Sequence, residues 1–303
     1  MNRGVKLALG IVAAVASLAW AFAGVDLPAL VAATRAARPL WIFAAVASVV
    51  ASLAAIVWRW WLLLDRPNRG VQARAPWAVL ASATLAAQMA NIVMPFRLGD
   101  GVRIVAASQT LGLGVARAAS AAVIERLADV MALGVIAATL VVIGVAPAWA
   151  RTALLRSSWM AALVIAVALV GVALVVWIGS RKVAALPSIG SLYWAVLGAI
   201  AVPMSSALTN LLVFRAFDLP VPASAALLLM VVLQVGTSIV TVPGGLGVSQ
   251  LLTVKTLAIW QVPPADALAF SLVLFAVANA PKLLMLPVAM AAAARSTARV
   301  VEV

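Results

Sequence analysis

The sequence contains no cysteine and no histidine. Their absence excludes disulfides, thiolate nucleophiles, Cys/His zinc sites, haem ligation by either residue and a histidine general base. Charged residues are also scarce, at 10% of the chain, whereas soluble domains carry about a quarter. Chemistry must therefore come from eight acidic groups, twenty-one basic groups, amides and hydroxyls.

Hydrophobic residues make up 66% of the 303 positions. Because a soluble domain needs more polar residues to cover its surface, this composition predicts an integral membrane protein. The net charge of +13 is explained either by cytoplasmic loop arginines or by attraction to anionic lipid headgroups. No basic run is dense, which argues against nucleic acid as a partner.

Six stretches are long and apolar enough to cross about 30 Å of hydrocarbon. They are residues 5–25, 39–64, 118–146, 159–178, 192–213 and 267–294. The first also resembles a signal peptide, because Ala21-Phe22-Ala23 follows a basic start, but its length favours a retained anchor. We therefore expect one all-α polytopic membrane domain over residues 1–303, with about six full spans.

Two further apolar stretches, 77–109 and 225–260, are each interrupted by proline and glycine. The interruptions share the pattern P-x-x-L-G, as PFRLG from Pro95 to Gly99 and as PGGLG from Pro243 to Gly247. Broken backbone survives in lipid only where protein or water satisfies it. The stretches therefore predict re-entrant or discontinuous helical hairpins. Their separation of about half the chain indicates an internal repeat, with halves at 40–150 and 190–294.

The distribution of basic residues predicts that both termini are cytoplasmic. With that topology the outside loops hold fewer basic residues than the cytoplasmic loops and tails. The outside basic residues are Arg35, Arg38, Arg151, Arg156 and Arg215. Three spans separate the two hairpins, so the hairpins enter from opposite sides, as in an inverted repeat. Most of the eleven tryptophans, Trp58 and Trp60 included, lie near predicted span ends, which is typical of an interfacial belt.

Charges inside apolar spans cost about 2.5–3.5 kcal/mol each on insertion scales, so they need a reason. Arg97, Asp100 and Arg103 lie three apart, near one face of a helix that begins after the first break. The free N–H groups and positive end of that helix, together with Arg97, predict a phosphate site. The alternative is a cytoplasmic surface loop with ordinary solvated charges.

A second group of charges comprises Glu125, Arg126 and Asp129. Glu125 and Asp129 are four apart and share a helix face. Together with the first group they predict a network of zero formal charge, from which a bound anion would displace internal pairs. The alternative is a span that begins after Asp129, with all three charges at the membrane interface.

The second break predicts neutral contacts with a ligand. Gly244, Gly245 and Gly247 allow backbone N–H groups to approach a ligand closely. Ser249 and Gln250 add side-chain donors. The alternative is a helix break that only lets helices pack.

Lysines in the apolar second half form the last candidates. Lys282 lies in the last predicted span beside Asn279 and is a candidate for phosphate binding. Lys255 can extend its charge to the membrane surface, so it is the weaker candidate.

The motifs resemble the lysylphosphatidylglycerol synthase transmembrane family, the flippase-like domain also found in the multiple peptide resistance factor. The resemblance rests on NIVMPFRLGDGVR, VIERLADV and VPGGLGVSQ and covers about residues 77–282. The positions that match the family motifs are Asn91, Pro95, Arg97, Gly99, Asp100, Arg103, Glu125, Arg126, Asp129, Pro243, Gly244, Gly245, Gly247 and Gln250. The family usually has Glu at Asp100 and at Gln250, and the Gln250 amide carries neither charge nor proton. Lys282 stands where relatives carry Arg.

The resemblance implies that the chain moves or exposes lipids between leaflets. Because the sequence shows no aminoacyl-transfer domain, we do not expect it to synthesise lysyl-lipid. We expect a translocase of the bacterial inner membrane, without metal or cofactor. Its partners are membrane lipids with a phosphate headgroup, of anionic, glycosylated or polyprenyl type, and homo-oligomers are compatible with this. The alternatives are a secondary transporter of a small anionic solute and an intramembrane lipid-modifying enzyme that uses Asp100, Glu125 and Asp129.

Overall fold

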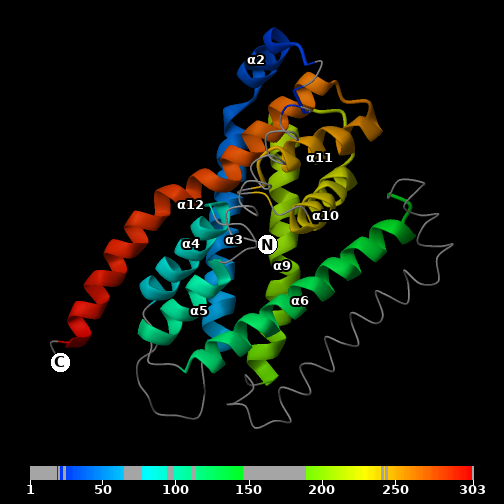
Figure 1. Ribbon diagram of the computed structural model, residues 1–303. Helices are drawn as coiled ribbons and strands as arrows, with labels where there is room; N and C mark the ends of the chain where they lie inside the picture. The colour runs from blue at the N-terminus through cyan, green and yellow to red at the C-terminus, as the bar shows by residue number, and fades with distance from the viewer. Residues whose placement is uncertain are drawn as a thin grey trace, which may run out of the picture. The chain divides into compact units, whose positions relative to one another are not determined.

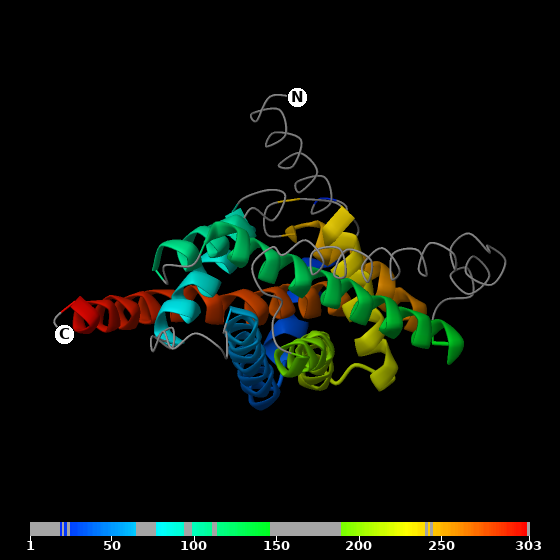
Figure 2. The same ribbon diagram turned by 90° about the horizontal axis from the view of Figure 1, so that it is seen from below.

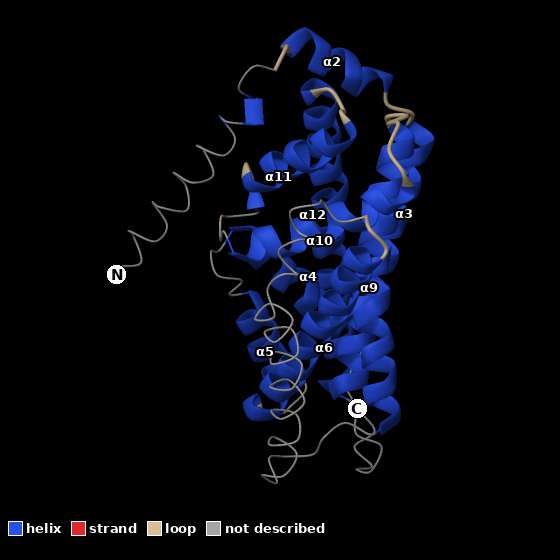
Figure 3. Cartoon of the chain, turned by 90° about the vertical axis from the view of Figure 1, so that its right-hand side faces the viewer, coloured by secondary structure: helices blue, strands red, loops and turns tan. Residues whose placement is uncertain are grey.

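A computed structural model of the chain describes residues 19, 21–22, 25–64, 77–93, 99–110, 114–145, 189–239, 242 and 245–301. These residues form nine α-helices and one short 3-10 helix, and none of them lies in a strand (Figure 3). In chain order the helices are α2 (Leu27–Ala36), α3 (Pro39–Leu64), α4 (Trp77–Val93), α5 (Gly99–Thr110), α6 (Val115–Val142), α9 (Ile189–Ala216), α10 (Ala223–Ile239), α11 (Val248–Leu257), η3 (Ala258–Trp260) and α12 (Pro264–Val301) (Figure 1). The chain is an all-α polytopic membrane protein, as its composition predicts.

Three of the described helices contain stretches long and apolar enough to cross a membrane: Pro39–Leu64, Val196–Ala216 and Pro264–Ala292. The last belongs to α12, which Figure 2 shows as one continuous helix. Helix α6 covers most of the predicted span 118–146. It is not one of the three helices that are apolar enough to cross a membrane, because it carries three charges in its first half. The predicted span 159–178 lies outside the described residues, as does most of the predicted span 5–25.

Pairs of shorter helices flank both predicted breaks. Helices α4 and α10 have 17 residues each, whereas α5 has 12 and α11 has 10. At 1.5 Å per residue these lengths correspond to about 25, 18 and 15 Å, less than the roughly 30 Å of a bilayer core. In each pair the helices pack together: Leu80 of α4 shares a core with Ala107 of α5, and Gly236 of α10 lies against Leu252 of α11. The helices from α3 to α6 thus repeat the order of lengths found from α9 to α12.

The chain divides into two compact units, which are described separately. Unit 1 takes its described residues from Met1–Ala51, Gln88–Gly99 and Met204–Leu284. Unit 2 takes its described residues from Ser52–Ala87, Asp100–Pro203 and Met285–Val303. This division differs from the predicted repeat halves 40–150 and 190–294, which stay a prediction.

In unit 1, helices α2, α9, α11 and α12 supply the apolar packing. Leu30 of α2 lies in one core with Leu268 of α12, and Phe214 of α9 stacks on Phe270 at 4.7 Å between ring centroids. Helix α2, which the sequence analysis did not predict, begins with a proline in its first turn, where a missing N–H costs nothing.

Two loops meet at one end of unit 1. The Arg38 N–H donates to the carbonyl oxygen of Ala216 at 2.8 Å, and its guanidinium donates to Asp218 Oδ2 at 3.0 Å. The predicted topology places the loops around Arg38 and Arg215 on the same side of the membrane, and this contact agrees with that. Which side they occupy stays a prediction.

In unit 2, the core comes from α3, α4, α5 and α6. Trp60 of α3 and Leu80 of α4 are completely buried in it, beside Ala118 and Ile124 of α6. Small alanines along α6 allow this close approach of helices. Trp60 therefore lies inside the helix bundle, and its assignment to an interfacial belt was wrong.

Candidate functional site

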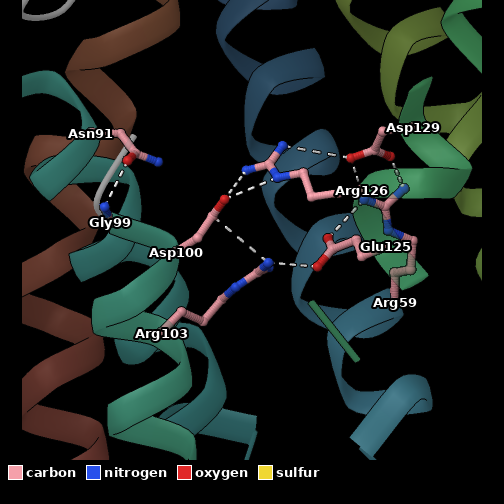
Figure 4. A network of polar contacts seen from close by, with 8 residues as sticks. All are labelled: Arg59, Asn91, Gly99, Asp100, Arg103, Glu125, Arg126 and Asp129. Atoms are coloured by element: carbon pink, nitrogen blue, oxygen red, sulfur yellow. Dashed lines mark hydrogen bonds and ion pairs between the residues drawn. The ribbon is translucent and has the colours of Figure 1, made fainter. Parts of the chain in front are cut away.

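Six charged side chains of α3, α5 and α6 form one network inside unit 2 (Figure 4). Its members are Arg59, Asp100, Arg103, Glu125, Arg126 and Asp129. Three arginines face three carboxylates, so the formal charge of the network is zero. Five of the six predicted members are linked in this network, and Arg59, which was not predicted, joins them. The sixth predicted member, Arg97, lies outside the described residues.

Glu125 is the centre of the network. Its Oε1 accepts a hydrogen bond from Arg59 Nη2 at 2.7 Å, and its Oε2 accepts one from Arg103 Nη2 at 2.6 Å. The three side chains are only 2% to 5% exposed. One buried carboxylate thus bridges two buried guanidinium groups, and this inner triad carries a formal charge of +1.

The outer part of the network is more open. Asp129 accepts from Arg59 at 2.6 Å, one helical turn after Glu125, as the i,i+4 spacing predicts. Asp100 accepts from Arg126 Nε at 2.9 Å. The side chains of Asp129, Asp100 and Arg126 are 23%, 26% and 41% exposed. The network therefore runs from a dry interior to an accessible edge.

Several buried hydrogen-bond donors of unit 2 have no acceptor, two of them on the inner triad itself. Among the described residues of unit 2, Arg59 Nε, Trp60 Nε1, Thr84 Oγ1 and Arg103 Nε are buried and lack a hydrogen-bond partner. The Arg103 guanidinium carbon lies 4.1 Å from the centre of the Trp60 ring, in cation–π geometry. Because unpaired buried donors are costly, their presence beside a +1 triad fits a site for an anionic oxygen ligand.

Gly198 of α9 makes room for Arg59. A Cβ at this position would lie 2.9 Å from Arg59 Cδ and 3.4 Å from Cγ. The aliphatic part of Arg59 therefore packs directly on the α9 backbone. This contact helps to aim the guanidinium at Glu125 and Asp129.

Arg59 and Trp60 were not predicted as members of the site. Both belong to the run Trp58-Arg59-Trp60-Trp61 near the end of a long apolar span. An arginine within that span was the available signal, because an intramembrane charge needs a partner. The tryptophans around it favoured an interfacial interpretation instead.

The start of α5 differs in part from the prediction. Gly99 begins the helix, and its N–H donates to Asn91 Oδ1 at 2.8 Å (Figure 4). Asp100 follows in the first turn, where a carboxylate compensates the positive end of the helix. This N-terminus is therefore already supplied with negative charge from within the protein. Pro95 and Arg97 lie outside the described residues.

At the second break, in unit 1, the N–H groups of two glycines donate hydrogen bonds to acceptors within the same turn. The Gly245 N–H donates to the Val242 carbonyl at 3.0 Å, and the Gly247 N–H donates to Gln250 Oε1 at 2.7 Å. Both glycines have positive φ, 67° and 80°, which favours glycine. The expectation that these two N–H groups contact a ligand therefore does not hold, because the turn folds back on itself. Pro243 and Gly244 lie outside the described residues.

Lys282 also belongs to unit 1. Its Nζ lies 3.4 Å from Asn279 Oδ1 on the same helix, and the side chain is partly buried. Its role in binding phosphate stays a prediction.

The carboxylates of the network are all engaged by arginines. Glu125 is held by Arg59 and Arg103, Asp129 by Arg59, and Asp100 by Arg126. Among the residues that the structure describes, no group of three His, Cys, Asp or Glu side chains is placed to hold a metal ion. Each carboxylate of the network is therefore paired with at least one guanidinium group.

One family model matches the sequence, over residues 7–285; it is described as the lysylphosphatidylglycerol synthase TM region. No curated protein matches the sequence.

Proposed function

Because the chain belongs to the lysylphosphatidylglycerol synthase TM-region family, we propose that it is a lipid translocase. It moves or exposes a lipid with a phosphate headgroup across the bacterial inner membrane, with both termini in the cytoplasm. The lipid is anionic, or of glycosylated or polyprenyl type. The protein transports this lipid and does not transform it, so none of its residues is assigned a catalytic role.

The observation that carries the proposal is the pair of buried arginines with unused donors. Arg59 and Arg103 each spend guanidinium N–H groups on Glu125 and keep an Nε without an acceptor. Trp60 Nε1 is a third unused donor beside Arg103. A phosphate oxygen is the acceptor that suits this set best, because arginine binds phosphate through several N–H groups at once.

The network also offers a way to bind and release the headgroup. Since its six charges sum to zero, an entering phosphate meets no excess of positive charge and competes with a carboxylate for an arginine. Asp129 and Asp100 are the more exposed carboxylates. Their ion pairs with arginine are therefore the first to separate when the phosphate enters. When the phosphate leaves, the internal pairs form again, so neither state leaves buried arginines without a counter-charge.

Two other functions, a solute transporter and an intramembrane enzyme, make different demands on the charge network. A secondary transporter of a small anionic solute would use the same arginines but would not need lipid. An intramembrane enzyme would need free carboxylates, whereas each carboxylate of the network is paired with an arginine. The pairing favours the binding functions over the enzyme.

Lipid movement in liposomes tests the proposal. Fluorescent phosphatidylglycerol in vesicles containing the full chain should become accessible to an external quencher faster than in empty vesicles. Arg103→Gln should slow this by at least about ten-fold, because it removes charge-assisted hydrogen bonds to the phosphate. Arg103→Lys, which keeps the charge, should lose less.

The matched control is Arg38→Gln, which removes an arginine from an exposed pair of unit 1. It should leave the rate unchanged. Wild-type protein that moves no phosphorus-containing lipid, with or without a pH gradient, would refute the translocase. Uptake of a small anion into vesicles without lipid movement would favour the solute transporter instead.

A further inference from the structure

One buried amide at the start of α11 has half of its hydrogen-bonding capacity unused. The Gln250 side chain is completely buried, and its Nε2 has no hydrogen-bond partner. Its Oε1, in contrast, accepts from the Gly247 N–H at 2.7 Å and from Ser249 Oγ at 3.1 Å. Among the buried side-chain atoms described in unit 1, Gln250 Nε2 is the one without a partner.

The orientation of this amide is fixed by its neighbours. The Gly247 N–H can only donate, so the oxygen of Gln250 must face it and the nitrogen cannot take its place. Because Nε2 and Oε1 are bonded to the same carbon, Nε2 lies next to the N-terminus of α11. Nε2 therefore stays beside that helix end. If the amide rotated to bring Nε2 to another partner, Gln250 would lose its hydrogen bond with the Gly247 N–H.

The surroundings favour a negatively charged oxygen at this donor. Helix α11 has 10 residues and no acidic residue in its first turn, whereas α5 has Asp100 there. Its positive end is therefore not compensated by a carboxylate of its own first turn. The hydroxyls of Thr253 and Thr256 donate to carbonyls of the preceding turn. Neither hydroxyl oxygen accepts a hydrogen bond from Gln250 Nε2, which has no partner.

We propose that Gln250 Nε2 and the N-terminus of α11 form a neutral subsite for one oxygen of a phosphate group. A phosphate oxygen carries negative charge and no proton, so it pairs with the amide donor and with the positive helix end. The phosphate comes from a lipid headgroup or from free phosphate. Only the assignment to a lipid rests on the proposed function.

Gln250→Glu is the sharpest variant. The carboxylate keeps an oxygen for the Gly247 N–H and keeps the shape of the side chain, but it replaces the Nε2 donor with a repelling oxygen. Gln250→Met removes the donor without adding charge. Ser238→Ala is the control, because it removes an exposed hydroxyl of α10 that donates to the Gln234 carbonyl and leaves the Gln250 amide in place.

Binding to the full chain in detergent micelles provides the measurement, with dioleoyl phosphatidylglycerol as the probe and dioleoylglycerol as its phosphate-free counterpart. Gln250→Glu should weaken binding of the phospholipid by about ten-fold or more, as expected for a lost hydrogen bond to a charged group. Gln250→Met should weaken it less. Ser238→Ala should stay within about two-fold of the wild type. Thermal melting checks that each variant is folded.

Competition by inorganic phosphate distinguishes the two sources. If it displaces the phospholipid from the wild type, but not from Gln250→Glu, the subsite takes phosphate itself. If it does not compete, and the variants still weaken phospholipid binding, the subsite takes the lipid headgroup. Equal binding by wild type, Gln250→Glu and Gln250→Met would overturn the proposal, as would equal binding of dioleoylglycerol.

This test separates the subsite from the translocase. A wild type that binds phospholipid through Gln250 but moves none would refute the translocase and keep the subsite. A working translocase whose binding ignores the Gln250 variants would refute the subsite alone.

Discussion

Arg59 Nη2 lies 2.7 Å from Glu125 Oε1, although the two residues are 66 positions apart and lie on different helices. Both side chains are almost completely buried. Their pairing brings α3 and α6 into a fixed register in unit 2, and Arg103 completes the pairing from α5. A buried charge pair of this kind is costly to break, because the remaining partner keeps its charge without a counter-ion.

Replacing Glu125 with Gln is expected to destabilise the protein strongly. The change leaves two buried guanidinium groups without their shared carboxylate, which typically costs about 3–5 kcal/mol. Reversible denaturant unfolding in detergent measures the difference.

The control for this change is Asp218→Asn, which breaks the exposed pair with Arg38. Asn tolerates the positive φ of 52° found at this position, so only the charge changes. Its expected cost is about 0–1 kcal/mol. Equal costs for the two variants would show that Glu125 is not a buried counter-ion.

Trp60→Phe separates the structural role of the ring from its N–H. The variant keeps an aromatic face for Arg103 and removes Nε1, which has no acceptor in the structure. We expect a modest loss of stability, about 1 kcal/mol, from the smaller ring. If Nε1 binds the phosphate, translocation should fall by several-fold, measured with the same fluorescent lipid.

Trp58→Phe is the matched control, because Trp58 packs edge-on against Trp194 at 5.7 Å and lies outside the charge network. It should not change the translocation rate. The same reduction in both variants would indicate general damage to α3 rather than a lost donor.

Gly198→Ala is expected to disturb the network without altering any charge. The new methyl group would lie 2.9 Å from Arg59 Cδ, so the Arg59 side chain must shift, and its contacts with Glu125 and Asp129 change with it. Overpacking of this kind costs about 1–3 kcal/mol. Unfolding and translocation should both be affected.

Gly134→Ala on α6 is the comparison, since a Cβ there meets nothing within 4 Å. Helix propensity predicts a gain of up to about 1 kcal/mol. If Gly198→Ala behaves like Gly134→Ala, the packing of Arg59 on α9 does not position it.

Gly236→Ala tests the α10–α11 hairpin. A Cβ at Gly236 would overlap Leu252 Cδ1, so the two helices must separate or Leu252 must rotate. We expect a loss of about 1–3 kcal/mol in the free energy of unfolding. In a Leu252→Ala background the same change should be neutral to within about 0.5 kcal/mol, because the overlapping atom is gone. Additive losses in the double variant would place the clash elsewhere.

The sequence predicted much of the network because helix spacing and the first break bring Asp100 and Arg103 near Glu125 and Asp129. It did not predict Arg59. Helix α3 is apolar on all sides, so its sequence does not tell which face packs against α6. The burial of Trp60 was missed for the same reason, since only tertiary packing separates an interfacial tryptophan from a core one.

At the second break, the position of the helix was predictable from the sequence, but the hydrogen bonding of its N–H groups was misjudged. The glycine pattern correctly predicted where α11 begins, and it suggested free N–H groups there. Gln250 stands at the third position of α11 and its side chain accepts from the Gly247 N–H, which is the half of a capping box that a glycine at the helix start allows. That signal was present in the sequence and predicts the internal use of the Gly247 N–H.

The distance in sequence between Arg59 and Glu125 has a consequence for biosynthesis. A ribosome completes α3 well before it makes α6, so Arg59 enters the bilayer before its carboxylate exists. During that interval the rest of α3 must offset an insertion cost of about 2.5–3.5 kcal/mol for the lone arginine. The 26 residues of α3 contain no other charge. Because the rest of α3 is apolar, this helix can insert into the bilayer with Arg59 unpaired, before Glu125 of α6 has been synthesised.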